Sequence, residues 1–351
     1  MDKGKVITVL GPIDADKIGI TLPHEHILMD ISAYFSEPEE TTEKKMAYEK
    51  VSIENLYWMH THLMGNKDDC ILNDEEIAVK ELLRFKKCGG KSVVELSCIG
   101  LSRDPRGLKR IAIETGLNII MGAGYYVGCS HPEKVKKMNA DEVAEEIIKD
   151  ITIGAGDTGI RAGIIGEIGC SLPLEDGERK IVRASARAQK KTGVAINIHP
   201  SRDDECLLEI LDILKEEKAD LSHVVFSHVG HFGYREETIE TLAKAGCYLE
   251  FDTFGHPALP VESFKSEERL LEMPSDVQRI YHIKEIIEKG YERQILISQD
   301  SCFKHKLITY GGYGYAHILE HIVPWMKARD FSAEQINMFL IENPKRMLMV
   351  K

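Results

Sequence analysis

Short apolar segments recur along the chain and predict a series of buried strands. Their apolar positions are nearly continuous rather than alternating with polar ones, which is typical of strands covered on both faces, as in a parallel sheet wrapped by helices. Several segments are bounded by glycine. The eight segments span residues 19–26, 91–97, 118–124, 163–169, 194–200, 223–229, 247–252 and 294–300.

Segments with apolar residues at helical spacing lie between these strands, and several end in Lys followed by Gly, a combination that stops helices. They span residues 75–89, 141–151, 177–193, 204–217, 236–246 and 275–290. This alternation with eight strands predicts the α/β class and a (β/α)8 TIM barrel, a single domain over residues 1–351. A doubly wound open sheet is the structural alternative. Residues 5–22 predict a short N-terminal β-hairpin, with GPIDAD (11–16) as its turn.

The composition narrows the class of protein. With 43% hydrophobic and 29% charged residues, the chain can bury a large core. Its net charge of -12 argues against a nucleic-acid or membrane partner and favours a small-molecule substrate. There is no apolar run of secretory or transmembrane length, and the eight cysteines form no C-x-x-C pair. We therefore predict a cytoplasmic protein with reduced thiols, and the sequence leaves a homodimer open.

Six potential metal ligands lie at or near the carboxyl ends of the predicted strands. Active sites of barrels gather at that end, where side chains from strands distant in sequence converge. Four imidazoles and two carboxylates there would suit one or two divalent metal ions, zinc above all, although manganese or cobalt would tolerate the same ligands. The six residues are His24, His26, Glu167, His199, His228 and Asp300.

The spacing of the first pair fits this interpretation. His24 and His26 stand at positions i and i+2 of a strand, which point to the same side about 6 to 7 Å apart. His60 and His62 have the same spacing, but ENLYWMHTHL reads better as a helix, on which i and i+2 do not face each other. Each histidine alone could be an ordinary hydrogen-bonded side chain, with His231 as a competitor for His228.

The two carboxylates differ in how strongly each one alone indicates a metal site. Glu167 follows the apolar GIIG, where a carboxylate is costly to bury unless it is paired or bound to a metal. Asp300 taken alone could simply cap the turn that follows it. The six positions together favour a metal site.

The segments GPIDADKIGITLPHEHI, RAGIIGEIG, INIHPSR, VVFSHVGHF and LISQDSC follow in this order and resemble the phosphotriesterase-related branch of the amidohydrolase superfamily. The resemblance implies a binuclear centre with two divalent ions per chain. Many members bridge the ions with a carboxylated lysine, whereas the matching stretch here carries Glu167, so we predict no lysine modification. The implied ligands are His24, His26 and Asp300 on the more buried ion and His199 and His228 on the more exposed one.

Such a centre implies a hydrolase. Two ions sharing a water lower its pKa and supply hydroxide, while the exposed ion polarises the substrate oxygen. Asp300 would then take the proton and pass it toward the leaving group as a general acid/base.

The substrate is less well defined, because the fold does not choose among organophosphates, acyl-homoserine lactones and phosphorylated sugar lactones. Tyr126 stands where lactonases of this family resemble one another in having a tyrosine near the metals, and an ordinary packed aromatic is the alternative. The loops 253–275 and 301–313 should shape the pocket.

Those loops and the segment beyond are rich in cations, which favours a polar or anionic substrate. Cationic side chains could hold a phosphate, although each could also be a solvated surface charge. The candidates are Lys265, Arg279, Tyr281, Lys304, His305 and Lys306. GGYGYAHIL (311–319) resembles the sugar-lactone side of the family. We therefore favour a lactonase acting on a small or phosphorylated sugar lactone.

Three alternatives remain open at this stage. A phosphotriesterase would use the same centre with a predominantly apolar pocket. Another ester or amide hydrolase would also use it. A non-catalytic metal-binding barrel would bind metal without turnover, and an intact ligand set that includes Asp300 argues against it.

Overall fold

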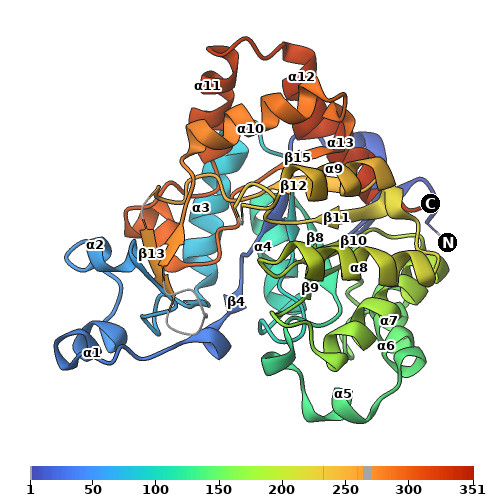
Figure 1. Cartoon of the computed structure of the whole chain (residues 1–351), viewed down its shortest axis with the longest axis horizontal. Helices are drawn as coiled ribbons and strands as arrows, with labels where there is room; N and C mark the ends of the chain where they lie inside the picture. The colour runs from blue at the N-terminus through green and yellow to red at the C-terminus, as the bar shows by residue number, and fades with distance from the viewer. Residues whose placement is uncertain (1, 232, 259, 264–269) are drawn as a thin grey trace.

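The computed structural model describes residues 2–231, 233–258, 260–263 and 270–351 (Figure 1). Its centre is an eight-stranded parallel sheet in the order β15-β12-β11-β10-β9-β8-β7-β3. The backbone of Asp300, beyond β15, donates to the His24 carbonyl on β3 at 3.2 Å, which brings the two edges together. The predicted (β/α)8 TIM barrel is confirmed. Its strands are β3 (Thr21–Glu25), β7 (Ser92–Glu95), β8 (Asn118–Ala123), β9 (Ile164–Gly169), β10 (Ile196–His199), β11 (Val224–Phe226), β12 (Tyr248–Phe251) and β15 (Ile295–Ile297).

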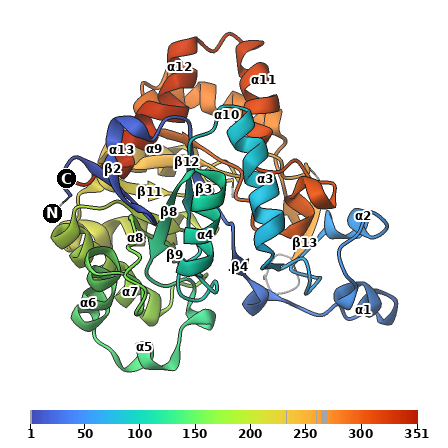
Figure 2. The same cartoon turned by 180° about the vertical axis from the view of Figure 1, so that it is seen from behind.

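Helices surround this sheet, and all six predicted helical segments form (Figures 1 and 2). The predicted six correspond to α3 (Glu75–Lys87), α6 (Ala140–Thr152), α7 (Asp176–Thr192), α8 (Asp204–Glu216), α9 (Glu236–Ala245) and α10 (Asp276–Glu288). A further helix, α4 (Pro105–Thr115), was not expected from the sequence. It begins where the Asp104 carboxylate accepts from two backbone N–H groups, and it ends at Gly116 in the left-handed region, φ 65°. Both end signals are visible in the sequence.

Further helices lie outside this repeat. They are α1 (Thr41–Tyr48), α2 (Leu56–Met59), α5 (Glu133–Lys137), α11 (Val323–Lys327), α12 (Ala333–Asn337) and α13 (Asn343–Leu348), with π-helical turns at Ile318–Ile322 and Met338–Glu342. None of the helices in the described ranges combines the length and apolarity needed to cross a membrane.

The N-terminal hairpin forms, but its turn was predicted at the wrong place. β1 (Lys5–Thr8) pairs with β2 (Gly11–Asp14), so GPID is the second strand and the chain turns at residues 9–10. The Thr8 hydroxyl donates to the Gly11 carbonyl and accepts from the Leu10 N–H, which closes the turn early, and Gly11 takes φ 114°. The hairpin also packs closely on the barrel, because a Cβ at Gly163 would lie 2.1 Å from the Ile7 carbonyl oxygen.

A long excursion follows β3 and projects from one side of the barrel, with α1 and α2 at its far end (Figures 1 and 2). Its short strands are β4 (Met29–Asp30), β5 (His62–Leu63) and β6 (Ile71–Leu72), and β13 (Pro260–Ser263) and β14 (Leu270–Glu272) pair beside β5. The prediction of a helix through His62 was wrong. The Thr61 hydroxyl and the His62 ring both bind the Trp58 carbonyl that a continuing helix would use, so the helix ends at Met59.

The segment that projects after β3 binds the loop after β15 through hydrogen bonds and an ion pair. Asp69 accepts from the His305 ring at 2.7 Å and from the His305 backbone at 2.8 Å, and Asp68 pairs with Lys304 at 2.8 Å. Lys306 is buried and its ammonium donates to the Asp300 carbonyl at 2.8 Å. The three side chains are neither solvated surface charges nor open anion ligands, because acids and carbonyls of the chain itself bind them.

Candidate metal centre

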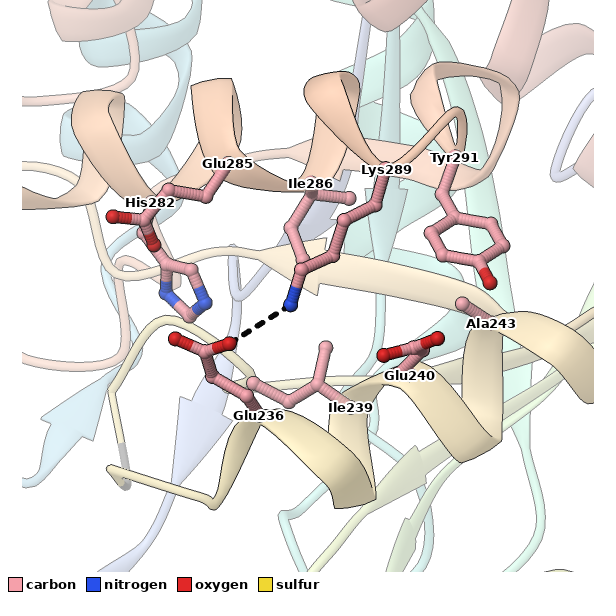
Figure 3. Close-up of a pocket in the computed structure, with 9 residues that line it drawn as sticks. All are labelled: Glu236, Ile239, Glu240, Ala243, His282, Glu285, Ile286, Lys289 and Tyr291. Atoms are coloured by element: carbon pink, nitrogen blue, oxygen red, sulfur yellow. Dashed lines mark hydrogen bonds and ion pairs between the residues drawn. The ribbon is translucent and has the colours of Figure 1, made fainter.

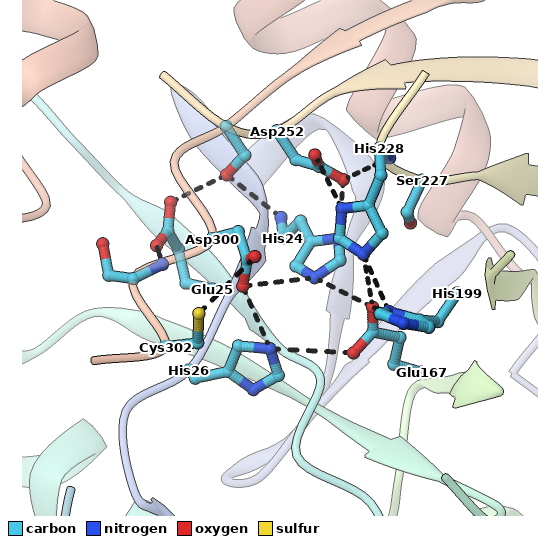
Figure 4. A network of polar contacts seen from close by, with 12 residues as sticks. His24, Glu25, His26, Glu167, His199, Ser227, His228, Asp252, Asp300 and Cys302 are labelled. Carbon is cyan, nitrogen blue, oxygen red and sulfur yellow. Dashed lines mark hydrogen bonds and ion pairs between the residues drawn. The ribbon is translucent and has the colours of Figure 1, made fainter. Parts of the chain in front are cut away.

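The six predicted ligands converge at the carboxyl ends of the barrel strands (Figure 4). His24 lies in β3 and His26 follows that strand directly. Glu167 lies in β9 and His199 ends β10, whereas His228 and Asp300 lie in the loops just beyond β11 and β15. Five are buried, and His199 is partly exposed. Sequence spacing therefore identified side chains that the fold brings together from five strands.

One half of the cluster forms around the first pair. The Nε2 atom of His24 lies 3.5 Å from Glu167 Oε1 and 3.8 Å from Asp300 Oδ1. The Nε2 atom of His26 lies 3.4 Å from the same Asp300 oxygen and 3.8 Å from Glu167 Oε2. Both imidazoles thus turn the same ring nitrogen toward the same two carboxylates, as expected for positions i and i+2 of a strand. Glu25, between them, instead accepts from Ser301 and its neighbours.

The other half contains the later histidines. Glu167 Oε1 lies 2.8 Å from His199 Nδ1 and 3.1 Å from His228 Nε2, and these two nitrogens are 2.8 Å apart. Glu167 therefore faces both halves. Two of the six residues also have left-handed backbones, His228 with φ 60° and Asp300 with φ 48°. Non-glycine residues in this region are uncommon and often accompany functional sites.

The donor set fits one or two divalent metal ions. The Nε2 atom of His24 is buried and has no hydrogen-bond partner, although it points at two carboxylates. Burying a polar atom without a partner is unfavourable, and a bound ion would supply one. His24, His26 and Glu167 form one compact ligand group, and Glu167, His199 and His228 form another. Imidazole nitrogens with carboxylate oxygens suit zinc and similar metals.

Two carboxylates that were not expected from the sequence support these histidines. Asp252 lies 3.0 Å from His228 Nδ1 and 3.2 Å from His24 Nδ1, and Glu250 lies 2.9 Å from His24 Nδ1. These are the ring nitrogens opposite the Nε2 atoms, so the acids fix the tautomer and orientation of the imidazoles. Two acids one residue apart in the apolar strand CYLEFD (247–252) were the available signal, since buried carboxylates need partners.

Removing this support should weaken the site. We expect Asp252→Asn to lower metal affinity or turnover by about 10- to 100-fold, because an amide holds both imidazoles less firmly and removes one charge. Chelator competition and kcat measured on the same preparation check this. Wild-type values for both quantities would show that Asp252 has no part in orienting the ligands.

The charged groups of the metal-free cluster should couple metal binding to the release of protons. Burial would lower the pKa of His228, but Asp252 and Glu167 raise it to about 10. Burial would also lower the pKa of His24, but Glu167 and Asp252 raise it well above its ordinary value. Burial would raise the pKa of Asp300, but His26 and His24 lower it to about 2. His24 and His228 thus carry protons at neutral pH in the metal-free protein, and a metal ion must displace them.

It follows that metal binding should strengthen as pH rises. We expect the zinc affinity of the metal-free protein, measured with a competing chelator, to increase steadily from about pH 6 to pH 9 because fewer protons remain to be displaced. Calorimetry in buffers of different ionisation enthalpy should show proton release. An affinity that is constant over this range would contradict the coupling.

The predicted substrate-binding residues differ in whether they lie near the histidine cluster. The Tyr126 hydroxyl lies 3.5 Å from His199 Nε2, beside the cluster. Arg279 is buried on α10, where it donates to Thr253 at 3.0 Å and to Asp276 at 2.9 Å, while its Nη2 atom has no partner. Tyr281 is 53% exposed on α10, with the Arg329 guanidinium 5.9 Å from its ring centre, and is not brought to the cluster. Lys265 lies outside the described residues.

A separate crevice lies between α9 and α10 in the outer helical layer (Figure 3). Its lining includes Ile239 and Ile286, and the Lys289 ammonium crosses it to reach Glu236 at 2.9 Å. This ion pair already satisfies both charged groups. The crevice therefore does not compete with the histidine cluster as a site for chemistry.

Comparisons with known proteins agree with this geometry. The sequence model of the phosphotriesterase family matches residues 4–348. The chain is 41% identical to an N-acetyltaurine hydrolase from Dictyostelium discoideum over 367 residues, covering 99% of this chain and 98% of the relative. It is 40% identical to an N-acetyltaurine hydrolase from Homo sapiens, covering 99% of each. Among solved structures, a resiniferatoxin-binding protein from Rhodobacter sphaeroides superposes with a TM-score of 0.93 at 34% identity, covering 99% of this chain and 96% of that one.

Proposed function

The chain belongs to the phosphotriesterase family of hydrolases, and from this premise we propose that it is a metal-dependent amide hydrolase that cleaves N-acetyltaurine or a close analogue. One observation carries the proposal, namely the identity of about 40% to proteins of that name over 99% of the chain. The sugar lactone favoured by the sequence analysis lacks comparable support, because Lys304, His305 and Lys306 are bound by other groups of the protein.

The proposed reaction uses the six-residue cluster. Divalent ions bound by these residues would supply a Lewis acid and would lower the pKa of a nearby water. Asp300, whose Oδ1 atom lies among the Nε2 atoms of His24 and His26, accepts a proton from the attacking water at a carboxylate oxygen. The water oxygen bonds to the acyl carbon, the C–N bond breaks, and Asp300 returns the proton to the departing amine nitrogen. We assign to Tyr126, whose hydroxyl lies 3.5 Å from His199 Nε2, a hydrogen bond to the substrate.

The anionic end of the substrate needs a cation, and we assign Arg279 to it. The Nη2 atom of this guanidinium is buried and has no hydrogen-bond partner among the residues that the structure describes. Thr253, which accepts from Arg279, follows Asp252 directly, so this cation lies next to the residues that support the cluster. Guanidinium groups bind oxyanions through parallel hydrogen bonds, and a sulfonate presents three oxygens.

A substrate panel tests the reaction class. The metal-loaded protein is assayed with N-acetyltaurine, N-acetyl-β-alanine, neutral N-ethylacetamide, a phosphorylated sugar lactone and a paraoxon-like triester. We expect the highest kcat/KM for N-acetyltaurine and the lowest among the amides for N-ethylacetamide, which has no anionic end. A clear preference for the lactone or the triester would overturn the proposal, as would the absence of any amide cleavage.

A further inference from the structure

A buried thiol contacts the proposed proton acceptor through a different carboxylate oxygen from the one that faces His24 and His26. The Sγ atom of Cys302 donates to Asp300 Oδ2 at 3.6 Å, whereas Asp300 Oδ1 is the oxygen that faces His26 Nε2 at 3.4 Å and His24 Nε2 at 3.8 Å. The carboxylate thus has one oxygen toward the cluster and the other on the thiol (Figure 4). Cys302 is 6% exposed, so water does not replace this contact easily.

The backbone of the same turn is fixed independently of the thiol. The Cys302 N–H donates to the Asp300 carbonyl at 2.8 Å, and the Lys306 ammonium donates to the same carbonyl at 2.8 Å. The terminal torsion of an aspartate side chain, however, is broad and roughly two-fold, so a fixed backbone does not set the plane of the carboxylate. A donor on one oxygen supplies the missing restraint.

We propose that Cys302 is a positioning residue, whose thiol hydrogen bond to Oδ2 holds the Asp300 carboxylate so that Oδ1 faces the metal-binding imidazoles. This inference rests on the proposed function of Asp300 as ligand and proton acceptor. A thiol is a weak donor, but a donor to a charged acceptor is stronger than one to a neutral acceptor. Partners of this kind behind a metal ligand typically change metal affinity or activity by about 10- to 100-fold.

Three variants separate positioning from packing. Cys302→Ala removes the donor and leaves a small cavity, Cys302→Ser keeps a donor, and Cys247→Ala makes the same cavity at a fully buried thiol at the start of β12. Metal affinity by chelator competition, kcat, KM and Tm are measured for each. We expect Cys302→Ala to lower metal affinity or kcat about tenfold with KM little changed. Cys302→Ser should restore most of the loss, and Cys247→Ala should lower Tm alone.

A double-mutant cycle shows whether the effect passes through Asp300. In the Asp300→Asn background, Cys302→Ala should cause no further loss of metal affinity or kcat, because the acceptor it positions has changed. Wild-type affinity and kcat in Cys302→Ala would overturn the inference, as would an equal loss in both backgrounds or in Cys247→Ala. A fully active Asp300→Asn variant would instead refute the proposed function of Asp300, so the two failures are distinguishable.

Discussion

Asp300→Asn is expected to lower kcat by about 10²- to 10⁴-fold, the range that a general acid or base contributes. The amide is nearly isosteric, but its oxygen is a poor base and it has no proton to return to the leaving amine. Asp300 is suited to this role because its Oδ1 atom lies 3.8 Å from His24 Nε2 and 3.4 Å from His26 Nε2, among the atoms that would hold the ions.

The measurement is kcat at matched metal content. Asp69→Asn is the matched control, since Asp69 is also a buried aspartate but binds His305 in the loop after β15. It should lower stability more than turnover. Near-normal kcat in Asp300→Asn with fully occupied metal sites would remove Asp300 from the mechanism.

Glu167→Gln is expected to have the second large effect, a loss of metal binding together with a fall in kcat of at least about 100-fold. Glu167 is the carboxylate that faces both halves of the cluster, with oxygens within 3.8 Å of ring nitrogens from all four histidines. Burial would raise its pKa, but His199 and His24 lower it well below the ordinary value. Its negative charge therefore balances the cluster, and a neutral amide would leave the bound cations without their shared partner.

Metal stoichiometry by mass spectrometry of the purified variant checks this expectation. Glu81→Gln serves as control, because Glu81 is also buried but accepts from the backbone N–H groups of Ile308 and Thr309 and belongs to none of the metal-ligand groups. That variant should keep its metal. Two ions per chain and normal turnover in Glu167→Gln would show that Glu167 does not bridge the halves.

The barrel could be predicted because its strands are buried on both faces. That burial demands continuous apolar segments, such as those that became β8 and β9, and the sequence displays them directly. The turn of the hairpin and the end of α2 were predicted incorrectly for a different reason. Side-chain hydrogen bonds decide both features. The Thr8 hydroxyl closes the hairpin turn, and the Thr61 hydroxyl and the His62 ring end α2. Such bonds compete with backbone pairing and leave no periodic pattern in the sequence.

The candidate site, too, was predicted in part and missed in part. The six ligands stand at strand ends, and spacing and strand position together identified them. Asp252 and Glu250 were missed because only the folded barrel places β12 behind His24 and His228. The side chains of Lys304 and His305 were misjudged because their partners, Asp68 and Asp69, lie more than 200 residues earlier in the chain. Contacts between distant segments cannot be read from local pattern.

One titration tests the central claim most directly. Protein stripped of metal is supplied with zinc in steps, and N-acetyltaurine cleavage is followed by release of the free amine. We expect no cleavage without metal and a rise that reaches a plateau at two ions per chain, as two ligand groups sharing Glu167 imply. Full activity in the metal-free protein would contradict the account.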